Sequence, residues 1–161
     1  VIVGPMGVGK TTLARLLARA LNRPFVDSDR VILGRRGRTG RELAEEEGVD
    51  VLHTLEARVL LDSLEAERPS VIAAAGSVVE RPEVRRALAD ATVVWLDGRP
   101  RLVVERAARG LHRREITLEE AEALDRRRRP RYRSVADVTL DALRPADGLV
   151  AEVQAALEHR G

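Results

Sequence analysis

A glycine-rich segment near the start of the chain combines the residue types of a phosphate-binding loop. Residues 4–11 read GPMGVGKT, which satisfies the pattern G-x-x-x-x-G-K-[ST]. In such a loop, glycines let successive backbone N–H groups point into one concavity, where they bind phosphate oxygens together with the N-terminus of the next helix. The lysine adds a positive charge for the β- and γ-phosphates, and the hydroxyl that follows it can ligate Mg²⁺. The segment therefore predicts a site for ATP and Mg²⁺.

Lys10 is the only lysine in the protein, and the other 27 of its 28 basic residues are arginines. A planar guanidinium does not fit inside a tight phosphate-binding loop, whereas a small ammonium group does. We therefore expect Lys10 to bind phosphate and act in catalysis, and Thr11 to hold Mg²⁺. The other loop residues expected at the nucleotide are Gly4, Met6, Gly7, Val8, Gly9 and Thr12.

A strand before the loop and a helix after it must hold the loop in position. Residues 1–3 are apolar, and in residues 10–21 apolar side chains recur at the spacing of an amphipathic helix. Four more strands are predicted within residues 23–29, 70–75, 92–97 and 136–141. Further helices are predicted at residues 30–35, 41–47, 50–65, 82–89, 99–109 and 146–159. This alternation is typical of a parallel α/β sheet with five strands.

One further helix is marked by its first residues. Thr117 and Glu120 have the T-x-x-E spacing of a capping box, which predicts a helix start. Pro130 should disturb that helix, because proline lacks the backbone N–H and clashes with the preceding turn.

Length and composition favour a single domain over residues 1–161. The chain has no cysteine, which excludes disulfides and thiolate metal sites, and no apolar run near the ~20 residues of a membrane span. A formal charge of +2 and an aromatic content of 2% give no support for nucleic-acid binding. We expect a cytoplasmic protein with neither a nucleic-acid nor a membrane partner. Because Val1 lies inside an apolar run, we also expect the first strand to have lost its leading residues.

Two aspartates follow the second predicted strand. Asp27 and Asp29 are two residues apart, and side chains at this spacing on a strand point the same way. They could line one cleft at the carboxyl edge of the sheet, where ligands of α/β proteins bind. Alternatively, they cap the helix that is expected to start near Arg30.

Four features together resemble shikimate kinase. They are the phosphate-binding loop at the start, FVDSD at residues 25–29, a length near 160 residues, and RRPRYRSVADVTLDA at residues 128–142. The resemblance implies a three-layer P-loop kinase fold with sheet order 2-3-1-4-5, helices on both faces and a short lid at about residues 107–117. It also implies a monomer that transfers the γ-phosphate of ATP to shikimate, which yields shikimate 3-phosphate in aromatic amino acid biosynthesis.

The resemblance assigns roles on the acceptor side of the site. It implies that Asp27 supports Mg²⁺ and that Asp29 binds the acceptor hydroxyls and acts in catalysis. Arg128 stands two residues before the proline of R-x-P-x-Y, where the family has an arginine for the substrate carboxylate. A guanidinium matches a carboxylate with two parallel hydrogen bonds. The arginine run at residues 126–129 could instead be a solvated helix end.

The resemblance also assigns roles on the nucleotide side. It implies that Arg106 enters the lid near the adenine and that a lid arginine, Arg113 or Arg114, reaches the phosphates. Arg144 is expected to join the nucleotide site. A lid arginine can stabilise the charge of a transferring phosphoryl group, although a solvated loop charge is the alternative.

Two segments depart from the family pattern. The family's F-R-x-x-E becomes LHTLE at residues 52–56, so His53 replaces an arginine that binds the acceptor carboxylate. The family's G-G-G becomes AAG at residues 74–76, and two added methyl groups crowd the backbone approach that glycine allows. We still expect His53, Ala75 and Gly76 at the acceptor, a small hydroxylated acid. A gluconate-kinase-like enzyme for another polyol or hydroxy acid, or an ATP-binding regulatory module without an acceptor site, are the alternatives.

Overall fold

Strands and helices alternate along the chain in the computed structural model, which describes residues 1–109 and 115–158. The strands are β1 (Ile2–Val3), β2 (Phe25–Asp27), β3 (Val71–Ala73), β4 (Val94–Asp97) and β5 (Val138–Asp141). The α-helices are α1 (Lys10–Ala20), α2 (Ser28–Arg36), α3 (Gly40–Glu47), α4 (Val49–Leu64), α5 (Pro82–Ala87), α6 (Pro100–Arg109), α7 (Leu118–Val135) and α8 (Ala146–Glu158). Two short 3₁₀ helices are η1 (Gly76–Glu80) and η2 (Leu88–Asp90).

The five strands form one parallel sheet in the order β2-β3-β1-β4-β5, as predicted. Strand β1 lies at the centre, with Ile2 aligned to Ala73 on one side and to Val94 on the other. Because all strands are parallel, the segments that follow them emerge at the same edge of the sheet. The loop after β1, the start of α2 and η1 therefore begin at one edge of the sheet.

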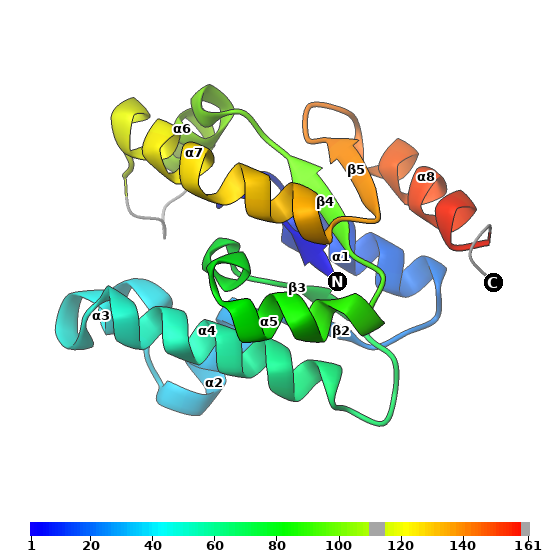
Figure 1. The fold of residues 1–161 in the computed structure, drawn as a ribbon, viewed down its shortest axis with the longest axis horizontal. Helices are drawn as coiled ribbons and strands as arrows, with labels where there is room; N and C mark the ends of the chain where they lie inside the picture. Colours follow the sequence, from blue (N-terminus) through cyan, green and yellow to red (C-terminus); the bar gives the residue numbers. More distant parts are fainter. Residues whose placement is uncertain (110–114, 159–161) are drawn as a thin grey trace.

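The sheet separates two apolar layers, because successive side chains of a strand point to opposite faces. Ile2 packs with α1 and α8 on one face, whereas Val3 packs with α4, α5 and α7 on the other. Helices α1 and α8 lie side by side in Figure 1. Leu13 and Leu60, one from each layer, are fully buried, and each such leucine contributes roughly 1.5–3 kcal/mol. The predicted arrangement of helices on both faces is confirmed.

Helix α7 starts as predicted but does not break at Pro130. The backbone N–H of Glu120 donates to the Thr117 hydroxyl at 3.1 Å, and the Glu120 carboxylate accepts from the Thr117 N–H at 3.1 Å, which completes the capping box. The helix then continues through Pro130 to Val135, so the expected disturbance is wrong. A proline in a helix costs roughly 3 kcal/mol. Here Tyr132, in the turn after Pro130, is buried and stacks on a tryptophan ring, and this packing offsets that cost.

A helix that spans a membrane must be long and apolar. Among residues 1–109 and 115–158, no helix combines the length and the apolar character that crossing a bilayer requires.

Candidate active site

The phosphate-binding loop follows β1 and packs against the end of β4. Gly4 has a φ of 147°, and a Cβ at this position would lie only 2.4 Å from the carbonyl oxygen of Leu96. An L side chain is disfavoured here both by the backbone conformation and by contact with β4. Gly9 caps α1 in a left-handed conformation, so the loop leads directly into the N-terminus of that helix. These two glycines give the loop the shape that the sequence motif predicts.

Two basic side chains hold the loop: Lys10, from the loop itself, and Arg106, from α6. The Lys10 ammonium donates to the carbonyl oxygens of Gly4 at 2.9 Å and Pro5 at 2.7 Å. The Arg106 guanidinium donates to the carbonyl of Val8 at 2.5 Å and, through its other nitrogen, to that of Ala142 at 3.2 Å. In a trans peptide the N–H points opposite to the C=O, so the N–H that follows the Val8 carbonyl points away from Arg106. Arg106 thereby helps to orient a backbone donor of the loop.

Asp27 serves two elements at once. Its Oδ1 accepts the backbone N–H groups of Asp29 at 3.0 Å and Arg30 at 3.4 Å and caps α2, which starts at Ser28 rather than near Arg30. Its Oδ2 accepts the hydroxyl of Thr11 at 2.9 Å. The capping interpretation is therefore correct for Asp27, and the same carboxylate also reaches the phosphate-binding loop.

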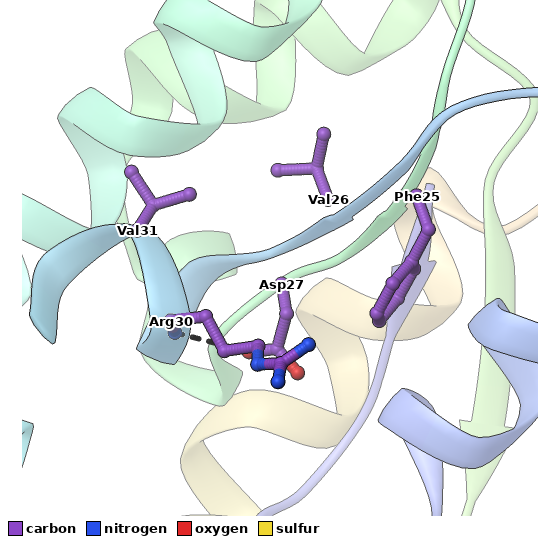
Figure 2. Close-up of a pocket in the computed structure, with 5 residues that line it drawn as sticks. All are labelled: Phe25, Val26, Asp27, Arg30 and Val31. Atoms are coloured by element: carbon purple, nitrogen blue, oxygen red, sulfur yellow. Dashed lines mark hydrogen bonds between the residues drawn. The ribbon is translucent and has the colours of Figure 1, made fainter. Parts of the chain in front are cut away.

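Figure 2 shows Asp27 where β2 passes into the first turn of α2. A hollow of about 220 Å³ lies beside it, lined by Phe25, Val26, Asp27, Arg30 and Val31. Of these residues, Asp27 is the one that hydrogen-bonds Thr11, so the hollow adjoins the loop through this side chain.

The oxygen atoms of Thr11 and Asp27 fit a magnesium site. Mg²⁺ prefers hard oxygen ligands and is commonly held by one or two protein groups together with substrate phosphates. No group of three or more acidic, histidine or cysteine side chains that could hold a metal occurs among residues 1–109 and 115–158. A cation at this place would thus depend on the nucleotide for the rest of its ligands.

Gly76, at the start of η1, marks where the acceptor side meets the phosphate-binding loop. A Cβ at this position would lie 3.1 Å from the Gly4 carbonyl oxygen, 3.1 Å from the Tyr132 hydroxyl and 3.3 Å from Nη1 of Arg128. The Tyr132 hydroxyl donates to the Gly76 carbonyl at 2.8 Å. The phosphate-binding loop and α7 both converge on Gly76, so a side chain at this position would fit only if these neighbours shifted by a few tenths of an ångström.

Arg128 lies in this convergence and is held by a carboxylate that sequence analysis missed. Its Nε donates to Oε2 of Glu80 at 3.1 Å, and its Nη2 lies 3.0 Å from the same oxygen. Arg127 forms a second ion pair with Glu80. Burial alone would raise the pKa of Glu80, but the charges of Arg128 and Arg127 outweigh burial and hold it below its ordinary value. Glu80 is therefore ionised between two arginines.

His53, on α4, is half-buried beside the same group. Burial lowers its pKa, and the positive charge of Arg128 lowers it further. The neutral imidazole is therefore favoured at pH 7. His53 can donate one hydrogen bond to an acceptor, but it does not supply the full charge of an arginine.

Glu56, one turn after His53, is a buried carboxyl that faces η1. It accepts a hydrogen bond from the Ser77 hydroxyl and is 9% exposed. Burial, helped by the negative charge of Asp29, raises the pKa of Glu56 to about 7. Its only sequence signal was the final position of the LHTLE segment, and sequence analysis gave it no role.

A comparison with protein families decides the identity. The sequence matches the family model described as "Shikimate kinase" over residues 6–158. The chain belongs to the shikimate kinase family.

Relatives and solved shikimate kinases agree with this. A shikimate kinase of Symbiobacterium thermophilum is 39% identical, covering 100% of this chain and 97% of that protein, and one of Dechloromonas aromatica is 43% identical, covering 87% and 79%. The structure of the Acinetobacter baumannii shikimate kinase in complex with shikimate superposes with a TM-score of 0.86 at 30% identity, covering 99% of this chain and 92% of that one. Membership makes the protein an ATP-dependent phosphotransferase with an alcohol acceptor.

A gluconokinase of Sinorhizobium meliloti has the same fold. It superposes with a TM-score of 0.69 at 20% identity, covering 98% of this chain and 90% of that one. At this identity the likeness extends to the fold alone.

Among the predicted acceptor residues of this shikimate kinase family member, Gly76 lies against Arg128, and the charge of Arg128 acts on His53. Ala75 lies between β3 and η1, at the carboxyl edge of the sheet. Arg144 pairs instead with Glu152 of α8, although it is close in sequence to Ala142, which Arg106 contacts. Arg113 and Arg114 lie outside the described residues. The roles of all these residues stay predictions.

Sequence analysis also missed the role of Arg129. Its guanidinium binds both carboxylate oxygens of Asp97 at 2.9 and 2.8 Å and also binds Asp125. Its central carbon lies 5.2 Å from the centroid of the Trp95 ring. The run of four arginines gave no sign of which one turns toward the sheet.

Proposed function

We propose that the protein transfers the γ-phosphate of ATP to a hydroxyl group of shikimate. The observation that carries this proposal is the set of charged side chains around the buried Glu56 carboxyl. Three charged residues from separate segments act on it: Lys10, Asp29 and Arg128. A cation suited to phosphate, a carboxylate suited to hydroxyl groups and a guanidinium suited to a carboxylate therefore surround one buried carboxyl. The Acinetobacter baumannii relative, solved with shikimate, supports the choice of acceptor.

On the nucleotide side, residues 4–12 bind the phosphates through backbone N–H groups and through Lys10. The Lys10 ammonium now contacts the Gly4 and Pro5 carbonyls at the loop itself, so a small shift brings it to the β- and γ-phosphate oxygens. Arg106 and Arg144 complete the nucleotide site. Arg113, or its neighbour Arg114, stabilises the charge that develops on the transferred group.

Thr11 and Asp27 are the residues that would hold Mg²⁺, because their oxygens already meet beside the loop at 2.9 Å. When bound, Mg²⁺ neutralises phosphate charge and orients the phosphates. Asp27 also caps α2, so the same side chain ties the metal site to the helix that carries Asp29.

On the acceptor side, Asp29 binds the reacting hydroxyl and aligns it with the γ-phosphate. The transition state of phosphoryl transfer is loose, so alignment matters more than strong basicity. Arg128 binds the carboxylate of the acceptor, and His53 donates one hydrogen bond to it. Ala75 and Gly76 form the wall next to the phosphate-binding loop.

The test is an ADP-release assay with ATP, Mg²⁺ and a panel of hydroxylated acids that includes shikimate and gluconate. We expect turnover with shikimate and background rates with gluconate. Turnover with another acid but not with shikimate would overturn the acceptor assignment. Tight ATP binding with no turnover on any acceptor would support a regulatory module instead.

We also propose that residues 1–161 act as one kinase domain, as a monomer in the cytoplasm, with neither a nucleic-acid nor a membrane partner. Light scattering after size-exclusion chromatography should give the mass of one chain. ADP release should be unchanged by added DNA, RNA or vesicles.

A further inference from the structure

The acceptor site must bind an acid beside carboxyl groups of the protein. The charge of Asp29 acts on the buried Glu56 carboxyl, and an acid such as shikimate adds a further negative charge beside them. His53 is held toward its neutral form, so it does not offset them. Arg128 is the cation that we assign to the acceptor carboxylate, yet its Nε and Nη2 lie on Glu80.

Glu80 joins two arginines rather than one. One carboxylate oxygen pairs with Nε of Arg127, and the other contacts Arg128 at 3.1 Å and Nη2 of Arg127 at 3.5 Å. Both arginines also act on His53, since each lowers its pKa. The two guanidinium groups and the carboxylate thus lie together beside the position where the family binds the acceptor carboxylate.

We propose that Arg127 is a specificity-determining residue, whose charge offsets Glu80 so that Arg128 keeps an uncompensated positive charge for the acceptor carboxylate. This inference rests on the proposed function. Arg127, Glu80 and Arg128 together carry a net charge of +1, which matches one carboxylate. Without Arg127 the pair that remains, Glu80 and Arg128, is neutral and offers the acceptor carboxylate no net positive charge.

The structure separates the tasks of the two arginines. The Arg128 side chain is 11% exposed and points Nη1 at Gly76, inside the cleft. The Arg127 side chain is 53% exposed and contacts Glu80 from the solvent side. Arg128 is therefore the arginine placed to bind the acceptor under the proposed function, whereas Arg127 acts through Glu80 and at longer range, where water weakens its effect.

The experiment compares wild-type protein with Arg127→Ala, Arg127→Lys and the double variant Arg127→Ala/Glu80→Gln. Arg127→Ala should raise the KM for shikimate about threefold to tenfold, with kcat and the KM for ATP within about twofold of wild type. Arg127→Lys should retain most of the wild-type KM. The double variant restores the net charge of +1, so its KM should return to within about twofold of wild type. Arg126→Ala is the matched control, because Arg126 is an exposed neighbour on the same helix.

Binding of the methyl ester of shikimate separates charge from structure. The ester has no carboxylate, so Arg127→Ala should change the dissociation constant of shikimate but not that of the ester, both measured by calorimetry. An equal loss for both ligands, or a double variant no better than Arg127→Ala, would overturn the inference. If the wild-type protein phosphorylates shikimate and Arg127→Ala is unchanged, this inference alone fails. If the wild-type protein does not phosphorylate shikimate, the proposed function fails.

Discussion

Replacing Arg129 with glutamine removes the guanidinium that joins helix α7 to strand β4. Two of its nitrogens donate to the two oxygens of Asp97 at 2.9 and 2.8 Å, and Nε donates to Asp125 at 3.0 Å. The same guanidinium lies over the Trp95 ring. Without it, two partly buried carboxylates remain close together with no cation between them. We therefore expect a loss of stability from the missing contacts and from the uncompensated charges.

The magnitude follows from the burial of the three side chains. Removing one partner of a buried ion pair costs about 3–5 kcal/mol. Arg129, Asp97 and Asp125 keep side-chain exposures of 14%, 23% and 21%, so water relieves part of that penalty. We expect the free energy of unfolding to fall by about 2–3 kcal/mol. For a domain of this length, that loss lowers Tm by roughly 4–12 °C.

Urea unfolding of the wild type, Arg129→Gln, Asp97→Asn and the double variant measures the loss and the coupling between the two residues. We expect a coupling of about 1–3 kcal/mol. Arg133→Gln is the control, because Arg133 is exposed on the same helix, and its effect should stay within about 0.5 kcal/mol. A loss below about 0.5 kcal/mol for Arg129→Gln, or no coupling, would refute the reasoning.

Three further predictions concern the site itself. Lys10→Arg should abolish phosphoryl transfer in the ADP-release assay, because a guanidinium does not fit where the ammonium lies 2.9 Å from Gly4 and 2.7 Å from Pro5. Gly76→Ala should lower kcat by roughly ten- to hundredfold in the same assay, because the new Cβ would lie 3.1 Å from the Gly4 carbonyl and displace the loop. Because the pKa of Glu56 is raised to about 7 from an ordinary 4.5, the free energy of unfolding should fall as the pH rises from 4.5 to 7. Glu56→Gln should remove this fall, which we put at about 3 kcal/mol, in urea unfolding at pH 5 and pH 8.

Each of these predictions can fail. Near-normal turnover by Lys10→Arg would contradict the fit of the ammonium, and unchanged kcat in Gly76→Ala would contradict the close approach of the loop. The folded state binds the proton of Glu56 more tightly than the unfolded state does. Raising the pH above the ordinary pKa of glutamate therefore lowers the free energy of unfolding. A wild-type protein that is more stable at pH 8 than at pH 5, with no change in Glu56→Gln, would contradict it.

Much of the fold could be predicted because its signals are local. The strand, loop and helix around residues 1–21 follow from apolar spacing and from glycine positions, and the capping box at Thr117 follows from two side chains three residues apart. Pro130 was misjudged because local propensity counts the missing N–H but does not include the packing of Tyr132 in the next turn. The start of α2 was placed late because the capping role of Asp27 was considered only as an alternative.

In the candidate site, too, local features could be predicted from the sequence and long-range contacts could not. The phosphate-binding residues are contiguous in sequence, so motif and spacing identify Lys10 and Thr11 without any tertiary information. The acceptor side depends on contacts between residues that are far apart in the chain. Glu80 and Arg128 are an example, because neither position reveals that the two side chains meet.

The sequence by itself determined that the single lysine lies in a glycine-rich loop, which predicts a nucleotide-phosphate site, and that the chain has the strand and helix alternation of a P-loop kinase. Only the tertiary structure decided which carboxylate each arginine binds. In the run at residues 126–129, Arg127 and Arg128 turn to Glu80, and Arg129 turns to Asp97. Neighbouring residues of a helix point about 100° apart, so their partners are chosen by the elements that surround the helix and not by the run itself.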